Sequence, residues 1–100
     1  MVKHIILWQL KDELTTEEKT TVKEGIRTGL EGLQGRIDGL VEIKVQCQSL
    51  DSSNADVMLY SIFENEDALK AYAVHPAHVE VADTKVRPYT KTRLCLDFEF

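Results

Sequence analysis

Four segments of the chain alternate apolar and polar side chains with a period of two, which is typical of β-strands. Residues 1–10 and 56–63 are apolar on both faces, and this pattern predicts inner strands covered on both sides. Residues 40–47 alternate strictly between apolar and polar. Residues 92–100 place four large apolar side chains on one face: Leu94, Leu96, Phe98 and Phe100. We therefore predict four strands.

A first helix is predicted after the first strand. Thr15 and Glu18 have the spacing of a capping box, in which each side chain accepts a hydrogen bond from the other residue's backbone. The apolar residues that follow lie four, four, three and four positions apart and form one stripe: Val22, Ile26, Leu30, Leu33 and Ile37. We expect the helix to follow this stripe, with Gly35 and Gly39 bracketing its end.

Three further glycines, Gly25, Gly29 and Gly32, lie at helical spacing beside this stripe. An interior glycine costs a helix about 1 kcal/mol relative to alanine, so each needs a reason. One explanation is close approach of the helix backbone to the sheet. The other is that the missing side chains leave room for a ligand. The first is favoured, because small residues commonly serve packing.

A second helical region follows the third strand. Asn65 is a predicted N-cap, and the buried side of the short helix after it is predicted from three residues: Leu69, Tyr72 and Ala73. Pro76 disfavours helical geometry at the residue before it but suits the first turn of a new helix. We therefore predict a break at Pro76, a second helical piece to about Val86, and an end at Pro88.

The predicted order is strand, helix, strand, strand, helix, strand. This order is that of a ferredoxin-like α+β fold, βαββαβ, with a four-stranded antiparallel sheet over residues 1–100 as a single domain. The second and fourth strands are its edges, and the helices cover one face. Ile5 and Leu7 then lie on an uncovered apolar face. We predict that two copies pair through this face into a dimeric α+β barrel.

Composition narrows the classes of function. Twelve basic against seventeen acidic residues give a net charge of −5, which argues against nucleic acid and anionic membrane surfaces as partners. No apolar run approaches the roughly 20 residues of a membrane span, and the N-terminus lacks the pattern of a signal peptide. Cys47 and Cys95 fall on opposite edge strands without metal-ligand spacing. We expect a reduced, cytoplasmic protein without metal ion or cofactor.

The richest chemistry lies at the predicted helix break, where Tyr72, His75 and His78 occur within seven positions. Histidine exchanges protons near neutral pH, and a tyrosine hydroxyl can donate to a carbonyl oxygen that becomes an enolate. Asp97 is a candidate for orienting His78, and His4 can add a polar group to an apolar pocket. Structural roles compete with these: His75 as a helix cap, Tyr72 and His4 as core residues, and Asp97 as an edge-strand charge.

Several motifs give the chain a family resemblance: residues 2–7, residues 63–69, the stretch from Tyr72 through His75-Pro76-Ala77-His78-Val79, and Asp97-Phe98. Together they resemble the stress-responsive A/B barrel (Dabb) family. The resemblance implies a dimeric barrel of two ferredoxin-like subunits. One plant member is a polyketide cyclase, and its catalytic tyrosine and histidine and its orienting aspartate correspond to Tyr72, His78 and Asp97.

The same resemblance implies where a ligand would lie. The histidine at the cyclase's pocket entrance corresponds to His4, and its first helix lines the pocket. We therefore expect the following residues to contact a ligand: His4, Ile6, Trp8, Val22, Gly25, Ile26, Gly29 and His75. Bulky aromatic residues stand in the cyclase's first helix, so a different substrate is expected here. Another plant member holds magnesium at the subunit interface, but no ligands for it are identified in this sequence.

Three functions follow as alternatives. The first is a small homodimer that binds an apolar or carbonyl-bearing small molecule, in a stress or metabolic setting, without an assigned reaction. The second is a cyclase-like lyase or isomerase, in which His78 acts as general base and Tyr72 stabilises an enolate. The third is a cofactor-free or haem-related monooxygenase of the wider dimeric α+β barrel group. The sequence leaves open whether the protein is an enzyme.

Overall fold

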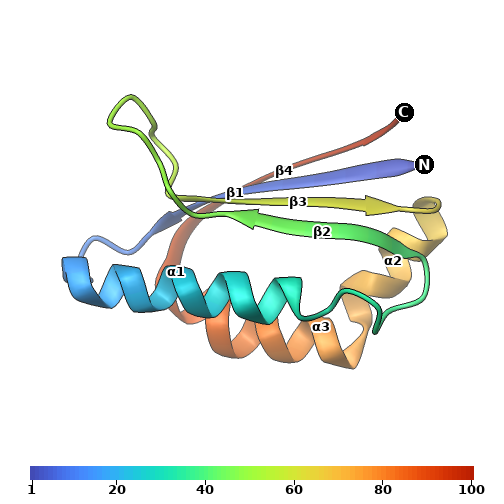
Figure 1. Ribbon diagram of the computed structural model, residues 1–100, viewed down its shortest axis with the longest axis horizontal. Helices are drawn as coiled ribbons and strands as arrows, with labels where there is room; N and C mark the ends of the chain where they lie inside the picture. The colour runs from blue at the N-terminus through green and yellow to red at the C-terminus, as the bar shows by residue number, and fades with distance from the viewer.

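The computed structural model describes all 100 residues, and its strands form one layer with every helix on the same side (Figure 1). The strands are β1 (Val2–Leu10), β2 (Leu40–Gln46), β3 (Val57–Phe63) and β4 (Thr90–Glu99). The helices are α1 (Thr16–Glu31), α2 (Glu66–Val74) and α3 (Pro76–Val81), and α3 continues through a π-helical turn (Ala82–Val86) and a 3-10 turn (Arg87–Tyr89) into β4. The predicted element order is confirmed.

All strand pairs are antiparallel, and the sheet order is β2-β3-β1-β4. The ferredoxin-like α+β fold is therefore confirmed, with β2 and β4 at the edges and β1 and β3 inside. Both inner strands are apolar on both faces, but the helices cover only one of these faces, so the other face of β1 and β3 stays partly exposed. The two ends of the chain meet, because the Phe100 amide donates to the Met1 carbonyl at 3.0 Å.

The first helix begins where predicted and ends earlier than predicted. Thr15 accepts from the Glu18 amide and Glu18 accepts from the Thr15 amide, so the capping box is confirmed. The helix stops at Glu31, although the apolar stripe continues to Ile37. Gly35 has a positive φ of 81°, which a helix does not tolerate. Leu33 and Ile37 are nevertheless buried, and they seal the core from the turns before β2.

The helix break in the second half is also confirmed. The Asn65 side chain accepts from the Ala68 amide at 2.8 Å and caps α2, and Pro76 occupies the first turn of α3. One prediction for α2 is wrong: Ala73 is exposed, and Tyr72 is the one fully buried residue of this helix. A nine-residue helix presents only a narrow face to the sheet, and beside Tyr72 this face holds the partly buried Ala68 and Leu69.

Of the helix glycines, Gly29 serves packing, and its neighbour is a helix rather than the sheet. A Cβ on Gly29 would lie 2.9 Å from Val81 Cγ1 of α3, closer than carbon atoms approach. At Gly25 the nearest atom is the Lys85 side-chain Cδ at 3.8 Å, an ordinary contact. Gly29 therefore sets the distance between α1 and α3, which fixes where the residues of α3 lie over the sheet.

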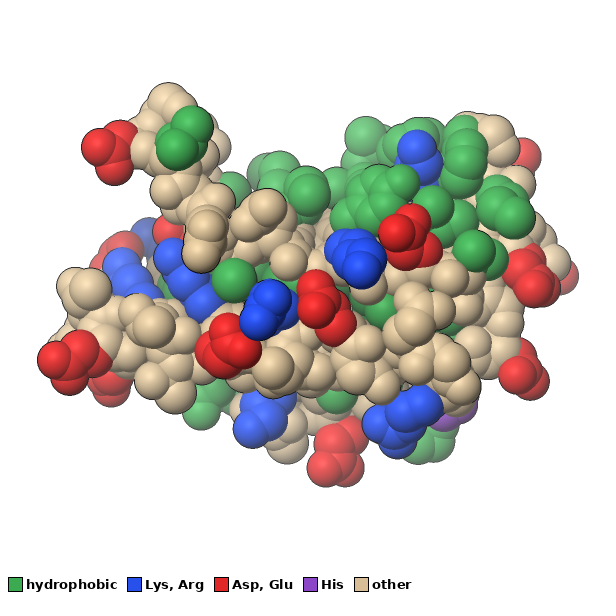
Figure 2. Space-filling view, viewed as in Figure 1, with side chains coloured by type: hydrophobic (Ala, Val, Ile, Leu, Met, Phe, Trp, Pro, Cys, Tyr) green, Lys and Arg blue, Asp and Glu red, His purple; other side chains and the backbone are tan.

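The face of the sheet opposite the helices is apolar and open. Figure 2 shows hydrophobic side chains gathered along this side, above the strands. Leu94 and Leu96 of β4 are each 63% exposed, and Ile5 pairs directly with Leu96. Further apolar side chains of the chain end also stay exposed: Phe98 and Phe100. This face is the uncovered apolar face predicted from the sequence.

None of the helices is long and apolar enough to cross a membrane.

Candidate functional site between the helices and the sheet

A polar pair lies on the helix-facing side of the sheet, between β1 and β4. The antiparallel register places His4 directly opposite Asp97, and His4 Nδ1 is hydrogen-bonded to the Asp97 carboxylate. On the neighbouring strand β3, the fully buried Ser61 hydroxyl donates to the His4 backbone carbonyl at 3.0 Å. His4 is itself buried at 8% exposure, so its imidazole is held firmly in a mostly apolar setting.

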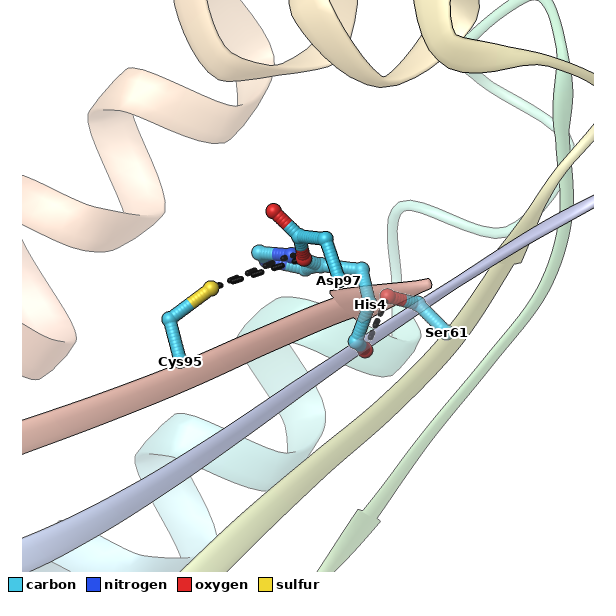
Figure 3. A network of polar contacts seen from close by, with 4 residues as sticks. All are labelled: His4, Ser61, Cys95 and Asp97. Carbon is cyan, nitrogen blue, oxygen red and sulfur yellow. Dashed lines mark hydrogen bonds and ion pairs between the residues drawn. The ribbon is translucent and has the colours of Figure 1, made fainter. Parts of the chain in front are cut away.

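Cys95 joins this pair from the same face of β4, two residues before Asp97. Its thiol donates to the Asp97 carboxylate at 3.4 Å and lies 3.8 Å from His4 Nδ1. Figure 3 shows the three side chains grouped above the two strands. Burial and the neighbouring Asp97 carboxylate raise the pKa of the Cys95 thiol, and the charge of Arg93 opposes this. One imidazole, one thiol and one carboxylate are a donor set that could hold a metal ion.

Tyr72 carries the most unusual polar group of the site. Its side chain is 1% exposed, and its hydroxyl has no hydrogen-bond partner in the chain. Burial raises the pKa of this hydroxyl strongly, with Arg93 opposing the rise, so the group stays a neutral donor. Buried hydroxyls are nearly always bonded, and leaving one unpaired costs about 1–3 kcal/mol. The Tyr72 hydroxyl is therefore a donor without an acceptor.

His78 lies against Tyr72, with ring centroids 4.1 Å apart. His78 Nδ1 is 3.3 Å from the Ala73 carbonyl oxygen, which can only accept. In the neutral ring, Nδ1 therefore holds the proton and Nε2 is an acceptor with no partner in the chain. Burial lowers the pKa of His78, the Ala73 bond opposes this, and the charges of Arg87, His4 and Arg93 lower it further. The imidazole is thus kept neutral near pH 7.

A cavity of about 90 Å³ adjoins His78. Its polar lining consists of two histidines, two arginines and a threonine: His4, His78, Arg87, Arg93 and Thr90. The remaining lining is apolar: Ile6, Trp8, Leu30, Leu59, Ala82 and Val86. A wider groove of about 590 Å³ runs alongside, between α2 and β4, and shares His4 and Arg93 with the cavity. The cavity and the groove therefore adjoin at His4 and Arg93.

The structure brings together some of the predicted ligand residues and separates others. His4, Ile6 and Trp8 line the cavity with His78. Val22 and Gly25 line a different depression of about 520 Å³, beside Lys85 and Tyr89. Ile26 is fully buried in the core, and the space beside Gly29 is filled by Val81. The first helix therefore does not line the His78 cavity at these four positions.

Two pairings differ from the sequence-based hypothesis. Asp97 does not orient His78 in this chain: it bonds His4, and His78 bonds the Ala73 carbonyl instead. The strand register decides this, because it places Asp97 opposite His4. His75 is a cap, since its Nδ1 accepts from the Ala77 amide at 3.1 Å at the start of α3. The structural alternative for His75 is therefore confirmed.

Several residues of the site were missed by sequence reasoning, among them two of β4. Arg93 lines both the cavity and the groove, and Cys95 completes the polar cluster with His4 and Asp97. The signal was present in the alternation of β4, which puts Arg93, Cys95 and Asp97 on one face. Finding them also required the register of β4 on β1, which pairs Trp8 with Arg93 and Ile6 with Cys95.

The fold and the helix-covered polar site define a ferredoxin-like α+β protein with a small cavity between its sheet and its helices. The sequence profile of the "Stress responsive A/B Barrel Domain" (Dabb) matches residues 2–100. The chain belongs to this family.

Solved structures agree with this assignment. A dimeric protein of unknown function with a ferredoxin-like fold from Bacteroides fragilis shares 34% identity, with a TM-score of 0.93 over 99% of this chain and 95% of that one. A dimeric ferredoxin-like protein of unknown function from Thermobifida fusca shares 24% identity, with a TM-score of 0.82 over 99% and 90% of the two chains. A comparison with curated proteins found no match.

The fold also occurs in a protein from Nitrosomonas europaea described as a candidate antibiotic biosynthesis monooxygenase. It shares 18% identity, with a TM-score of 0.75 over 100% of this chain and 98% of that one. A likeness at this identity shows the fold alone. The monooxygenase alternative therefore gains no support from it, and the cyclase alternative gains none from the two closer structures, whose function is unknown.

Proposed function

We propose that this protein binds a small carbonyl-bearing molecule with an apolar remainder in the cavity beside His78. The observation that carries the proposal is the buried Tyr72 hydroxyl, a hydrogen-bond donor without a partner. A ligand carbonyl oxygen would satisfy it and remove the cost of an unpaired buried group. Tyr72 itself lies behind the lining, in contact with the lining residue His78. Arg93 and Thr90 are donors of the lining, and the apolar lining residues suit the rest of such a molecule.

The size of the cavity limits the ligand. At about 90 Å³ it has roughly the volume of three water molecules in the liquid, each about 30 Å³. A carbonyl group with one or two neighbouring carbon atoms fits this space, and the rest of a longer molecule must extend past His4 and Arg93 into the groove. These two residues belong to both spaces, so a longer ligand would run along them.

The binding test uses Trp8, the only tryptophan of the chain and a lining residue of the cavity. Its indole N–H gives a single side-chain signal in a ¹⁵N correlation spectrum, which we would follow during titration with methyl acetoacetate. We expect a saturable shift for the wild type and a weakened one for Tyr72→Phe. Tyr60→Phe is the matched control, because Tyr60 pairs with Ile5 on the opposite face of the sheet. The absence of any saturable shift would exclude this ligand class.

A general-base role for His78 is a second proposal, and one observation favours it. The Ala73 carbonyl fixes the tautomer in which Nε2 is a free acceptor, so a neutral His78 can take an acidic proton from carbon beside the bound carbonyl. Tyr72 would hold the enolate oxygen, and Asp97 would act on the site through His4. Deuterium exchange at C2 of methyl acetoacetate tests the role. Exchange with His78→Gln as fast as with the wild type would exclude it.

We also propose that the protein is a homodimer that pairs through the apolar face of its sheet. The exposed Leu94, Leu96 and Phe98 support this, because monomeric proteins rarely leave such a continuous apolar face in water. The similar proteins from Bacteroides fragilis and Thermobifida fusca are described as dimeric. A cytoplasmic location is proposed as well, and the two unpaired cysteines support it.

A further inference from the structure

The cluster of His4, Cys95 and Asp97 converges on one point. Their donor atoms, one imidazole nitrogen, one sulfur and one carboxylate oxygen, all lie within 4.8 Å of one another. Both Cys95 and Asp97 approach the same ring nitrogen of His4, Nδ1. A catalytic cysteine–histidine–aspartate relay would use opposite ring nitrogens for its two partners. The arrangement around a single nitrogen is therefore that of a chelate and not that of a nucleophile with its base.

The distances between the donors are close to those of a tetrahedral metal site. Zinc bonds of about 2.0–2.3 Å to nitrogen, oxygen and sulfur place neighbouring donors roughly 3.3–3.6 Å apart. Cys95 Sγ lies 3.4 Å from the Asp97 carboxylate and 3.8 Å from His4 Nδ1. The hydrogen-bonded His4 and Asp97 are closer together and would separate slightly to admit the ion. Asp97 is an exposed edge-strand residue, so its side chain has room to move toward the groove.

An ion could also reach the cluster. All three residues line the groove between α2 and β4, whose other charged residues are Glu66, Lys70, Arg93 and Glu99. Counting Asp97, the groove through which an ion would reach the cluster is therefore lined by three carboxylates and two cationic side chains. We propose that His4, Cys95 and Asp97 form a binding site for a zinc-class divalent cation, with three protein ligands and a fourth position open to the groove. Thiolate and imidazole ligands together select zinc or cobalt over magnesium and calcium.

The test measures metal alone, without any organic ligand, on the untagged chain. Zinc binding is followed by titration calorimetry, and cobalt binding by the sulfur-to-cobalt charge-transfer band. We expect one ion per chain. Cys95→Ser should abolish the band and weaken binding at least about 100-fold, since the loss of even an outer-shell partner of a metal ligand costs 10- to 100-fold. Cys47→Ser is the matched control, because Cys47 follows β2 at the other edge of the sheet. This variant should leave the charge-transfer band and the zinc affinity unchanged.

Metal binding by two further variants tests the proposed ligands. Asp97→Asn, which keeps the size of the side chain, should also weaken zinc binding. Arg93→Gln removes a donor from the ligand cavity but none of the three proposed metal ligands, so it should weaken binding of methyl acetoacetate and keep the cobalt charge-transfer band. This difference in response separates the metal site from the proposed ligand site. A charge-transfer band that survives Cys95→Ser, or zinc binding unchanged by both Cys95→Ser and Asp97→Asn, would overturn the proposal.

Discussion

The ring of His78 lies 4.1 Å from the ring of Tyr72, centroid to centroid, so the half-buried imidazole packs directly against a fully buried phenol ring. Burial lowers the pKa of His78, and the folded state therefore binds its proton at lower pH than the unfolded chain does. The stabilisation from the neutral ring is fully present above about pH 6.5, the value for an unperturbed histidine, and is lost as the pH falls through the folded pKa.

The first prediction follows from this loss of stability at low pH. Between pH 7.5 and 5.5 the wild type should lose more unfolding free energy than His78→Gln, because glutamine takes up no proton on unfolding. Urea denaturation at a fixed protein concentration measures the difference, since a dimer's stability depends on concentration. Equal losses in the two proteins would show that His78 is not kept neutral by the fold.

The second prediction concerns the contact between α1 and α3. Gly29→Ala should destabilise the protein by about 1 kcal/mol, because overpacking against the stiff Val81 side chain costs about 1–3 kcal/mol and exceeds the gain in helix propensity. Gly25→Ala, with open space around it, should instead stabilise by about 0.5–1 kcal/mol. Thermal and urea unfolding of both variants measure this.

A double variant checks the cause at Gly29. Val81→Ala removes the methyl groups that the new Cβ would meet, so Gly29→Ala should become favourable in that background. If Gly29→Ala costs the same with and without Val81, the glycine serves something other than the contact with α3.

The third prediction tests the apolar face. Leu96→Glu places a charge on the exposed side chain opposite Ile5 and should shift the protein toward monomer without unfolding it. Val74→Glu is the matched control, because Val74 is also an exposed apolar residue but lies at the end of α2, on the helix side. Analytical ultracentrifugation at micromolar concentration distinguishes the species. A wild type that sediments as a monomer would contradict the proposed dimer.

The sequence predicts the fold well, because each element is specified locally. Period-two alternation marks the strands, and the Thr15 capping box, Asn65 and Pro76 mark the helix boundaries. The end of α1 is less well predicted. Leu33 and Ile37 continue the apolar spacing of the helix, but they lie in turns after its end and are still buried in the core. An apolar side chain can reach the core from a turn as well as from a helix, so the apolar spacing alone does not mark the end of the helix.

The site is harder to predict, because it depends on the register between β1 and β4. Local pattern identifies Tyr72 and His78 as neighbours on one helix break. It does not reveal that Asp97 lies opposite His4, or that Cys95 and Arg93 face the same way. A strand register follows from tertiary packing, and a shift by one residue would turn all three side chains to the other face.

The fourth prediction concerns the stability of Tyr72→Phe. The substitution removes only an unpaired buried hydroxyl, so the free protein should keep its stability or gain up to about 1 kcal/mol. Tyr60→Phe provides the comparison for loss of a tyrosine hydroxyl outside the site.

The central claim, that the Tyr72 hydroxyl is held for a ligand carbonyl, is tested most directly by the affinity of this same variant. Methyl acetoacetate is titrated into wild type, Tyr72→Phe and Tyr60→Phe, with the Trp8 indole signal as the readout. We predict that Tyr72→Phe raises the dissociation constant about 3- to 10-fold, the equivalent of one hydrogen bond, and that Tyr60→Phe leaves it unchanged. Equal affinity of Tyr72→Phe and wild type would contradict the claim.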